Sequence, residues 1–270
     1  MRILKIFRTF GSFPGKFTIA HFLAKSILNK KELVTFMGKR NLRYTIPNTI
    51  EPVGKELLIN GIYERKTIVL VEEILTGSSV FFDVGANIGS ITLPVAKSTG
   101  ADVHSFEPSR FTYQFLEKNV TQNCLTNVSL NNNAVHSVNG LDLQFYEAEE
   151  KYGNSSLSAT YSQQPHYSVK TISLDAYCER LKIDKIKVLK IDVQGYEIEV
   201  LKGAQNLIKN KAIDTIIFEM ESWAEEQAGY QIGASQEFLL KNGYELFTLE
   251  KMKLNKVLTT GSHMFLAKLK

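Results

Sequence analysis

The chain has few of the residues that form disulfide frameworks or structural metal sites. Its 270 residues include only two cysteines, Cys124 and Cys178. Two cysteines are too few to cross-link a domain of this size, and neither has the spacing of a zinc ligand. We therefore expect free thiols, no metal centre and, as the default compartment, the cytoplasm.

Long apolar runs are also missing, and no segment is apolar over the length that a membrane-spanning helix needs. The first residues resemble the start of a signal peptide. However, Lys5, Arg8 and Lys16 interrupt the apolar stretch, and no small-residue cleavage site follows. For residues 1–30 we instead predict one or two helices, broken near residues 11–15.

Acidic residues are nearly absent from the front of the chain. Residues 1–43 hold ten Lys or Arg residues and one acid, Glu32, whereas the remainder holds 22 basic and 27 acidic residues. The basic character therefore belongs to an N-terminal segment. This segment is expected to pack on its own domain, on a second copy of the chain or, as a peripheral contact, on a membrane surface. Outside it, no basic patch interleaved with aromatic residues indicates nucleic-acid binding.

The most informative motif lies in residues 79–90. The apolar run Val80–Phe82 predicts a strand with Asp83 at its end, and Ile88–Ala96 has the spacing of a helix. Glycines let a backbone approach a ligand closely, and a helix start offers free N–H groups, so this corner is typical of a nucleotide site. The turn between strand and helix contains Gly85, Ala86, Asn87 and Gly89.

The glycine spacing in this turn differs from the G-x-G-x-x-G of dinucleotide-binding proteins. An aspartate before the first glycine suits a cofactor with both an ammonium and a carboxylate, such as S-adenosylmethionine (SAM). The next predicted strand, Val103–Phe106, leads into Glu107 and Pro108. A carboxylate at that strand end can accept hydrogen bonds from both ribose hydroxyls. Together the two strand ends favour a SAM site over an ordinary strand–helix turn.

The third predicted strand, Val128–Leu130, ends in three asparagines followed by Ala134. At this position of the fold an Asn side chain, that of Asn133, either pairs with the edge of the adenine or only shapes a turn. Two further strands are predicted at Ile186–Asp192 and Thr215–Phe218. Because ligands of open α/β sheets bind beyond the carboxyl ends of the strands, residues at all five ends are expected at one site.

Three stretches in combination, DVGANIG, SFEP and VLKIDVQGYEIEVLKGA, resemble the FkbM-type SAM-dependent methyltransferases. The resemblance covers roughly residues 60–250. It implies an α/β, Rossmann-like class I methyltransferase fold, with a seven-stranded, mostly parallel sheet and helices on both faces. It also implies SAM as methyl donor and O-methylation of a hydroxyl on a sugar, glycan or natural-product intermediate. One departure is Gln194, where the family often has Glu.

Two segments follow from this assignment. Residues 1–60 are predicted to form a basic N-terminal extension, and residues 61–270 the SAM-binding methyltransferase domain. The expected cofactor contacts are Asp83, Gly85, Ala86, Asn87, Gly89, Glu107, Pro108, Asn133 and Ala134.

For catalysis, Asp192 is the predicted base, or it positions the acceptor hydroxyl. Glu219, which closes the fifth strand, is the second candidate, and His136 is a weaker alternative. Lys190 shares a strand face with Asp192 and would keep that carboxylate ionised. The alternative is a structural role, in which a buried Lys190–Asp192 ion pair only organises the site.

The remaining elements are predicted from periodicity. Residues 31–60 are expected to form short strands and turns, and the polar, Ser-rich residues 151–166 a substrate loop or a disordered hairpin tip. Predicted helices are Tyr63–Leu75, Phe111–Val120, Ser173–Leu181, Glu197–Ile208 and one around Phe238. Leu141–Tyr146 and Tyr167–Ile172 are predicted as strands, and Glu245–Leu249 and Met264–Leu269 as a final pair of antiparallel strands.

Two other functions stay open at this point. A nicotinamide-dependent oxidoreductase is disfavoured by the glycine spacing. A catalytically silent module that keeps the fold is disfavoured by the intact Asp83, Glu107 and Asp192. The methyl acceptor itself, a small molecule or saccharide, is not named by the sequence.

Overall fold

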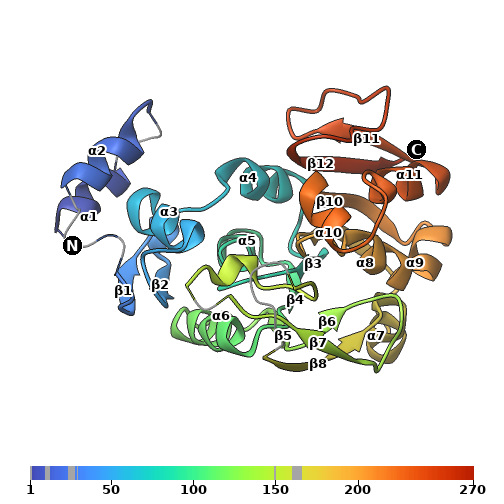
Figure 1. Ribbon diagram of the computed structural model, residues 1–270, viewed down its shortest axis with the longest axis horizontal. Coiled ribbons are helices and arrows are strands. Elements are labelled where there is room, and N and C mark those ends of the chain that lie inside the picture. Colours follow the sequence, from blue (N-terminus) through green and yellow to red (C-terminus); the bar gives the residue numbers. More distant parts are fainter. Residues whose placement is uncertain (1, 10–12, 24–27, 29, 149, 160–165) are drawn as a thin grey trace.

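A central sheet of seven strands organises the molecule (Figure 1). The computed structural model describes residues 2–9, 13–23, 28, 30–148, 150–159 and 166–270. The strands lie in the order β11-β12-β10-β9-β3-β4-β5. Their bounds are β3 (Val80–Val84), β4 (Asp102–Phe106), β5 (Val128–Asn131), β9 (Ile186–Ile191), β10 (Ile213–Glu221), β11 (Tyr244–Thr248) and β12 (Ser262–Leu269).

Neighbouring strands from β5 to β10 run parallel, and β12 is antiparallel to both β10 and β11. The predicted seven-stranded, mostly parallel sheet is confirmed, as is the antiparallel pairing of the last two strands. The chain order reverses beside β3, so the ends of β3, β4 and β9 meet at the crevice where open α/β sheets bind ligands.

Alternation along β3 sends consecutive side chains to opposite faces of the sheet. Phe81 packs in a core with α4 (Arg65–Ile74) and α5 (Thr92–Thr99), whereas Phe82 packs in the core of the other face. Both phenylalanines are fully buried. The second face is covered by α7 (Leu174–Leu181), α8 (Glu197–Gly203), α9 (Gln205–Lys209) and α11 (Ala234–Lys241).

The remaining elements lie around this sheet. A three-stranded sheet consists of β6 (Ala134–Val135), β8 (Tyr167–Ile172) and β7 (Asp142–Phe145), in which β7 and β8, both predicted as strands, pair antiparallel. Further helices after the first core strand are α6 (Arg110–Gln122), α10 (Ser222–Gln227) and a 3-10 turn, η2 (Tyr152–Asn154).

The N-terminal segment holds two helices, α1 (Arg2–Thr9) and α2 (Lys16–Leu23), which Figure 1 shows at the end of the molecule farthest from β11. The prediction for residues 31–60 was incomplete. It included the strands β1 (Val34–Met37) and β2 (Arg43–Ile46), with the 3-10 turn η1 (Lys39–Asn41) between them, but it missed the helix α3 (Pro52–Asn60). Pro52 begins this helix because a first-turn proline leaves no hydrogen bond unmade.

This segment is joined to the sheet domain by buried contacts. Side chains of β2 and α3, including Tyr44 and Leu57, share a hydrophobic core with Leu93 and Leu116. The buried Asn119 side chain accepts a hydrogen bond from the Thr45 N–H (2.7 Å) and donates one to the Thr45 carbonyl (3.1 Å). Residues 42–59 are therefore positioned to contribute to a site at the edge of the sheet.

Several element boundaries differ from prediction; the strand predicted to run to Asp192, for example, ends at Ile191. The helix after the glycine turn begins at Thr92 and not at Ile88, because Asn87 and Gly89 have left-handed φ values of 52° and 86°. The predicted helix Glu197–Ile208 is two helices that meet at Ala204. The helix expected to run to Leu75 ends at Ile74, and β10 continues to Glu221, so that Glu219 lies inside this strand.

Candidate active site

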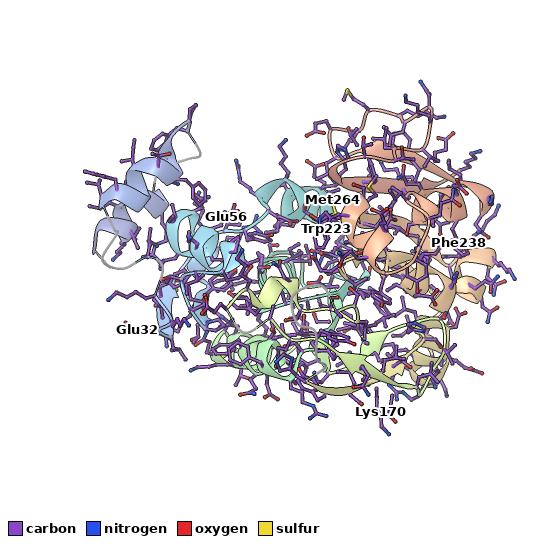
Figure 2. The ribbon with its side chains drawn as sticks, in the orientation of Figure 1. Glu32, Glu56, Lys170, Trp223, Phe238 and Met264 are labelled. Atoms are coloured by element: carbon purple, nitrogen blue, oxygen red, sulfur yellow. The ribbon has the colours of Figure 1, made fainter. Side chains whose placement is uncertain are left out.

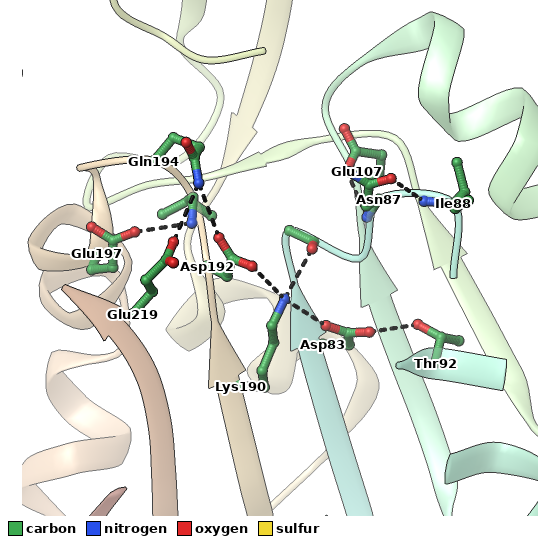
Figure 3. Close-up of polar contacts among 12 residues, drawn as sticks. Asp83, Asn87, Ile88, Thr92, Glu107, Lys190, Asp192, Gln194, Glu197 and Glu219 are labelled. Carbon is green, nitrogen blue, oxygen red and sulfur yellow. Dashed lines mark hydrogen bonds and ion pairs between the residues drawn. The ribbon is translucent and has the colours of Figure 1, made fainter. Parts of the chain in front are cut away.

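Lys190 lies at the centre of the polar cluster at the carboxyl ends of the strands (Figure 3). Its Nζ donates to the Gly85 carbonyl at 3.0 Å, and lies 3.3 Å from Asp83 Oδ1 and 3.5 Å from Asp192 Oδ2. Burial lowers the pKa of Lys190, but the surrounding carboxylates outweigh it and raise that pKa above its usual value. The charged lysine therefore links β3 to β9 beneath the site.

A cavity lies at these strand ends, and Asp83 does not line it. Its side chain is 0% exposed; Oδ2 accepts from the Thr92 hydroxyl at 2.6 Å, and Oδ1 faces Lys190. The cavity lining includes Gly85 and Asn87 but not Ala86 or Gly89. Asp83 can thus act on a ligand only through Lys190 or the turn.

Gly85 is required by the geometry of this turn. Its φ is +77°, and a Cβ atom there would lie 1.8 Å from the Asp192 carbonyl oxygen. Any side chain would push β3 away from the end of β9. Asn87, with φ 52°, aims its N–H at Glu107 Oε2, 2.8 Å away.

Glu107 is held by two backbone donors. Oε2 accepts from Asn87 and Oε1 accepts from the Ser109 N–H at 2.9 Å. Burial raises the pKa of Glu107 to about 7, although these two hydrogen bonds lower it. Each carboxylate oxygen keeps a second lone pair, and Glu107 and Pro108 line the cavity. Such a fixed carboxylate can accept hydrogen bonds from a pair of ribose hydroxyls.

The far end of the cavity is bordered by Asn133 and Ala134. The Asn133 amide donates to the Lys170 carbonyl at 3.2 Å. The two preceding asparagines do not line the cavity: the Asn131 amide donates to the Tyr177 hydroxyl, and the Asn132 amide donates to the Glu107 carbonyl. Of the three, Asn133 is the one that can face an adenine.

The opposite end of the cavity carries Asp192, Gln194 and Glu219. The Gln194 amide donates to Asp192 Oδ1 at 3.3 Å and to Glu219 Oε2 at 3.2 Å (Figure 3). Burial, then the charge of Asp192 and a hydrogen bond with it, raises the pKa of Glu219 well above its usual value, which favours the protonated form of Glu219. His136 does not line the cavity, and its ring instead lies 3.7 Å from Glu199.

Several lining residues were missed by the sequence analysis. Glu51, Tyr63 and Glu64 precede the glycine motif, and Glu51 is 2% exposed with a pKa that burial raises to about 7. No motif marks them, since they come from segments whose placement depends on tertiary packing. Glu197, also missed, accepts from the Val193 and Gly195 N–H groups and thereby shapes the turn after β9.

The polar loop after β7 covers part of the cavity, where Tyr152–Leu157 contribute to the lining. Tyr152 is buried and packs in the core that contains α3. The loop predicted at residues 151–166 thus borders the cavity over residues 152–157, and its residues 160–165 lie outside the described part.

A second groove adjoins the cavity and shares Glu64 and Glu219 with it. It runs between α4 and the β11–β12 hairpin, where Leu70 and Met264 line it; Figure 2 labels Met264 near α4. Among the residues that the structure describes, no group of three His, Cys, Asp or Glu side chains could hold a metal ion.

Comparison with known proteins places this geometry in a family. The chain is 31% identical over 180 residues to hexuronic acid methyltransferase AglP of Haloferax volcanii, covering 67% of this chain and 70% of that one. Solved structures with a similar arrangement include a Geobacter metallireducens precorrin-6y C5,15-methyltransferase (12% identity, 77% and 87% covered, TM-score 0.44). M. jannaschii TYW2 in complex with AdoMet is another (17% identity, 89% and 86% covered, TM-score 0.42). The methyltransferase FkbM domain model matches residues 83–246, and the chain belongs to this family of SAM-dependent methyltransferases.

Proposed function

We propose that this protein transfers the methyl group of SAM to a hydroxyl oxygen of a sugar or glycan. The observation that carries the proposal is the row of strand-end groups along one cavity, from Asp192 through Gly85 and Glu107 to Asn133. The relative from Haloferax volcanii is named for a hexuronic acid, which supports a saccharide acceptor.

The cavity fits the cofactor in both charge and order of groups. Glu107 would hold the ribose hydroxyls, Asn133 and Ala134 would border the adenine, and the Gly85–Asn87 turn would receive the amino-acid moiety. SAM supplies an electrophilic methyl group on a sulfonium, and an acidic lining suits that positive charge.

At the acceptor end, the protein must orient a hydroxyl in line with the methyl group and remove its proton. We assign Asp192 as the proton acceptor, because it borders the cavity and its side chain is 24% exposed. Lys190 holds the Asp192 carboxylate in place, and the protonated Glu219 can donate a hydrogen bond that positions the acceptor.

The family membership gives no support to a nicotinamide-dependent oxidoreductase. A silent binding module is separated from an enzyme by assay. The purified protein is incubated with SAM that carries a CD3 methyl group and with a panel of neutral glycosides and uronates. Mass spectrometry should find a CD3 group on a sugar oxygen. SAM binding without transfer to any sugar would contradict the sugar methyltransferase.

The N-terminal helices have an exposed apolar surface that is not explained by catalysis. Phe13, Phe17, Ile19, Phe22 and Leu23 are each at least 40% exposed, and Phe22 is 82% exposed. They lie in the segment with the excess of Lys and Arg. We propose that this surface contacts an anionic membrane surface, since aromatic side chains beside basic ones favour the interface of a bilayer. In the described residues no helix is long and apolar enough to cross a membrane.

The membrane contact is tested by sedimentation with vesicles of anionic and of neutral lipid. Binding to anionic vesicles that is lost in Phe17→Ser/Phe22→Ser supports it. If the wild type ignores both vesicles but forms dimers that the same variant breaks, the surface joins two copies of the chain and the membrane proposal is wrong. We further propose a cytoplasmic location, which agrees with the free thiols of Cys124 and Cys178.

A further inference from the structure

Glu64 is a carboxylate of the cavity to which the reaction described above gives no role. It precedes α4 with φ 40° and ψ 52°, a left-handed conformation that is uncommon for a residue with a side chain. Its Oε2 atom is buried and makes no hydrogen bond. An unpartnered carboxylate oxygen at a cavity wall is costly unless a ligand supplies the partner.

The position of Glu64 along the cavity is defined by its charged neighbours. Burial, which has the largest effect, and the Asp192 charge raise the pKa of the Glu64 carboxyl, whereas Lys190 lowers it. Hydrogen bonds with the Thr67 and Tyr63 side chains also lower this pKa, so only the Oε2 atom of Glu64 is left without a partner. Lys190 in turn bonds to the Gly85 carbonyl. Glu64 therefore lies at the end of the cavity formed by β9 and β3, and Glu107 and Asn133 follow along β4 and β5.

This order matches the order of groups in SAM: amino-acid moiety, sulfur, ribose, adenine. The aspartate that the sequence analysis assigned to the ammonium, Asp83, is 0% exposed and already paired with Lys190 and Thr92. The amino-acid end of the cofactor needs another carboxylate. We propose that Glu64 binds the ammonium group of SAM, an inference that rests on the cofactor placement in the proposed function.

A double-mutant cycle between protein and ligand tests the contact. The probes are S-adenosylhomocysteine and its analogue without the amino group, each titrated calorimetrically into wild type and Glu64→Gln. In the wild type, loss of the amino group should weaken binding about 10- to 100-fold, as for a hydrogen bond between charged groups. In Glu64→Gln this difference should nearly disappear. Glu73→Gln, which changes an exposed glutamate on the helix that follows Glu64, should behave as wild type.

Two other results would overturn the assignment. Equal weakening of both probes by Glu64→Gln would mean that Glu64 supports the fold or another part of the ligand. If the wild type binds both probes equally well, no carboxylate binds the ammonium. If Glu64→Gln does not fold, the comparison of the two probes in the wild type still decides whether any carboxylate binds the ammonium.

Glu107→Gln separates a failure of this inference from a failure of the proposed function. It should weaken both probes to the same extent, because both carry the ribose. If it weakens neither, the placement of SAM is wrong. If it behaves as expected while Glu64→Gln has no effect, only the role of Glu64 is wrong.

Discussion

The Lys190 ammonium lies 3.5 Å from the Asp192 carboxylate and 3.3 Å from that of Asp83, so one buried cation serves two strands. A buried ion pair gives little net stability, but removing one partner leaves an uncompensated charge. Without Lys190, the uncompensated charge would be that of Asp83, because its carboxylate is 0% exposed.

We therefore expect Lys190→Met to lower the free energy of unfolding by about 3–5 kcal/mol. Lys187→Met on the same strand is the matched control. Lys187 pairs with Asp214 at 2.9 Å but is 41% exposed, and loss of such a surface pair should cost about 0–1 kcal/mol. Chemical denaturation measures both. Equally small losses of stability in the two variants would mean that Lys190 does not stabilise the buried Asp83 carboxylate.

Stability should also depend on pH through buried carboxyl groups. Burial raises the pKa values of Glu51, Glu107 and Glu197 from 4.5 to about 7. The folded state then holds protons that the unfolded state has lost, and this stabilisation disappears as the pH rises through 7. Burial lowers the pKa values of His104 and His136, which has the opposite effect only below about 6.5.

The cofactor-free protein should thus melt at a lower temperature at about pH 8 than at about pH 6.5. Glu197→Gln, at a residue that does not itself line the cavity, should reduce the difference. A Tm that stays level or rises over this window in the wild type would show that these carboxyl groups are ionised in the folded state.

Cofactor affinity should have the opposite pH dependence. Above a pH of about 7 the Glu107 carboxylate is ionised and is a better acceptor for ribose hydroxyls. We expect SAM to bind more tightly at pH 8 than at pH 6, and Glu107→Gln to lose most of this dependence. Calorimetric titration across the range measures it. A pH-independent affinity in the wild type would place the ribose away from Glu107.

The sequence was informative where chemistry and backbone geometry coincide. The glycine turn, Glu107, Lys190 and Asp192 occupy strand ends, and strand periodicity alone places them at one edge of the sheet. Glu64 could not be found in this way, because a glutamate before a helix is usually a solvated helix-start residue. Its burial depends on the packing of α4 beside the sheet.

The helix boundaries depend on backbone conformation and tertiary contacts, which the spacing of apolar residues does not reveal. Residues 88–91 have helical spacing, yet the left-handed Asn87 and Gly89 delay the helix to Thr92. Residues 31–60 were expected to form only short strands and turns, yet Pro52 begins the helix α3. Such errors arise because the same residue types end and begin helices, and tertiary contacts decide between them.

Gln194 is the residue at which this chain departs from the family pattern, which often has Glu there. Its amide donates to both Asp192 and Glu219. Gln194→Glu removes these donors and adds a third carboxyl group, which makes loss of a proton at the site harder. In a plot of kcat/KM against pH, the fall in activity on the acid side should therefore move to higher pH by about one unit. An unchanged profile would show that the Asp192–Glu219 pair is insensitive to position 194.

The central claim is that Asp192 accepts the proton of the acceptor hydroxyl as the methyl group is transferred. Asp192→Asn keeps the shape and one hydrogen-bonding oxygen but loses the charge. General-base catalysis predicts a kcat lower by about 10²–10⁴ with SAM affinity nearly unchanged. The competing role, an ion pair that only organises the site, predicts a loss of stability of about 3–5 kcal/mol.

The direct measurement is the single-turnover rate of CD3 transfer by Asp192→Asn, corrected for the folded fraction, with Tm and SAM affinity recorded on the same preparation. The account predicts a folded protein that binds SAM and transfers the methyl group at least about 100-fold more slowly. A variant that is destabilised yet transfers the methyl group at the wild-type rate per folded molecule would contradict it.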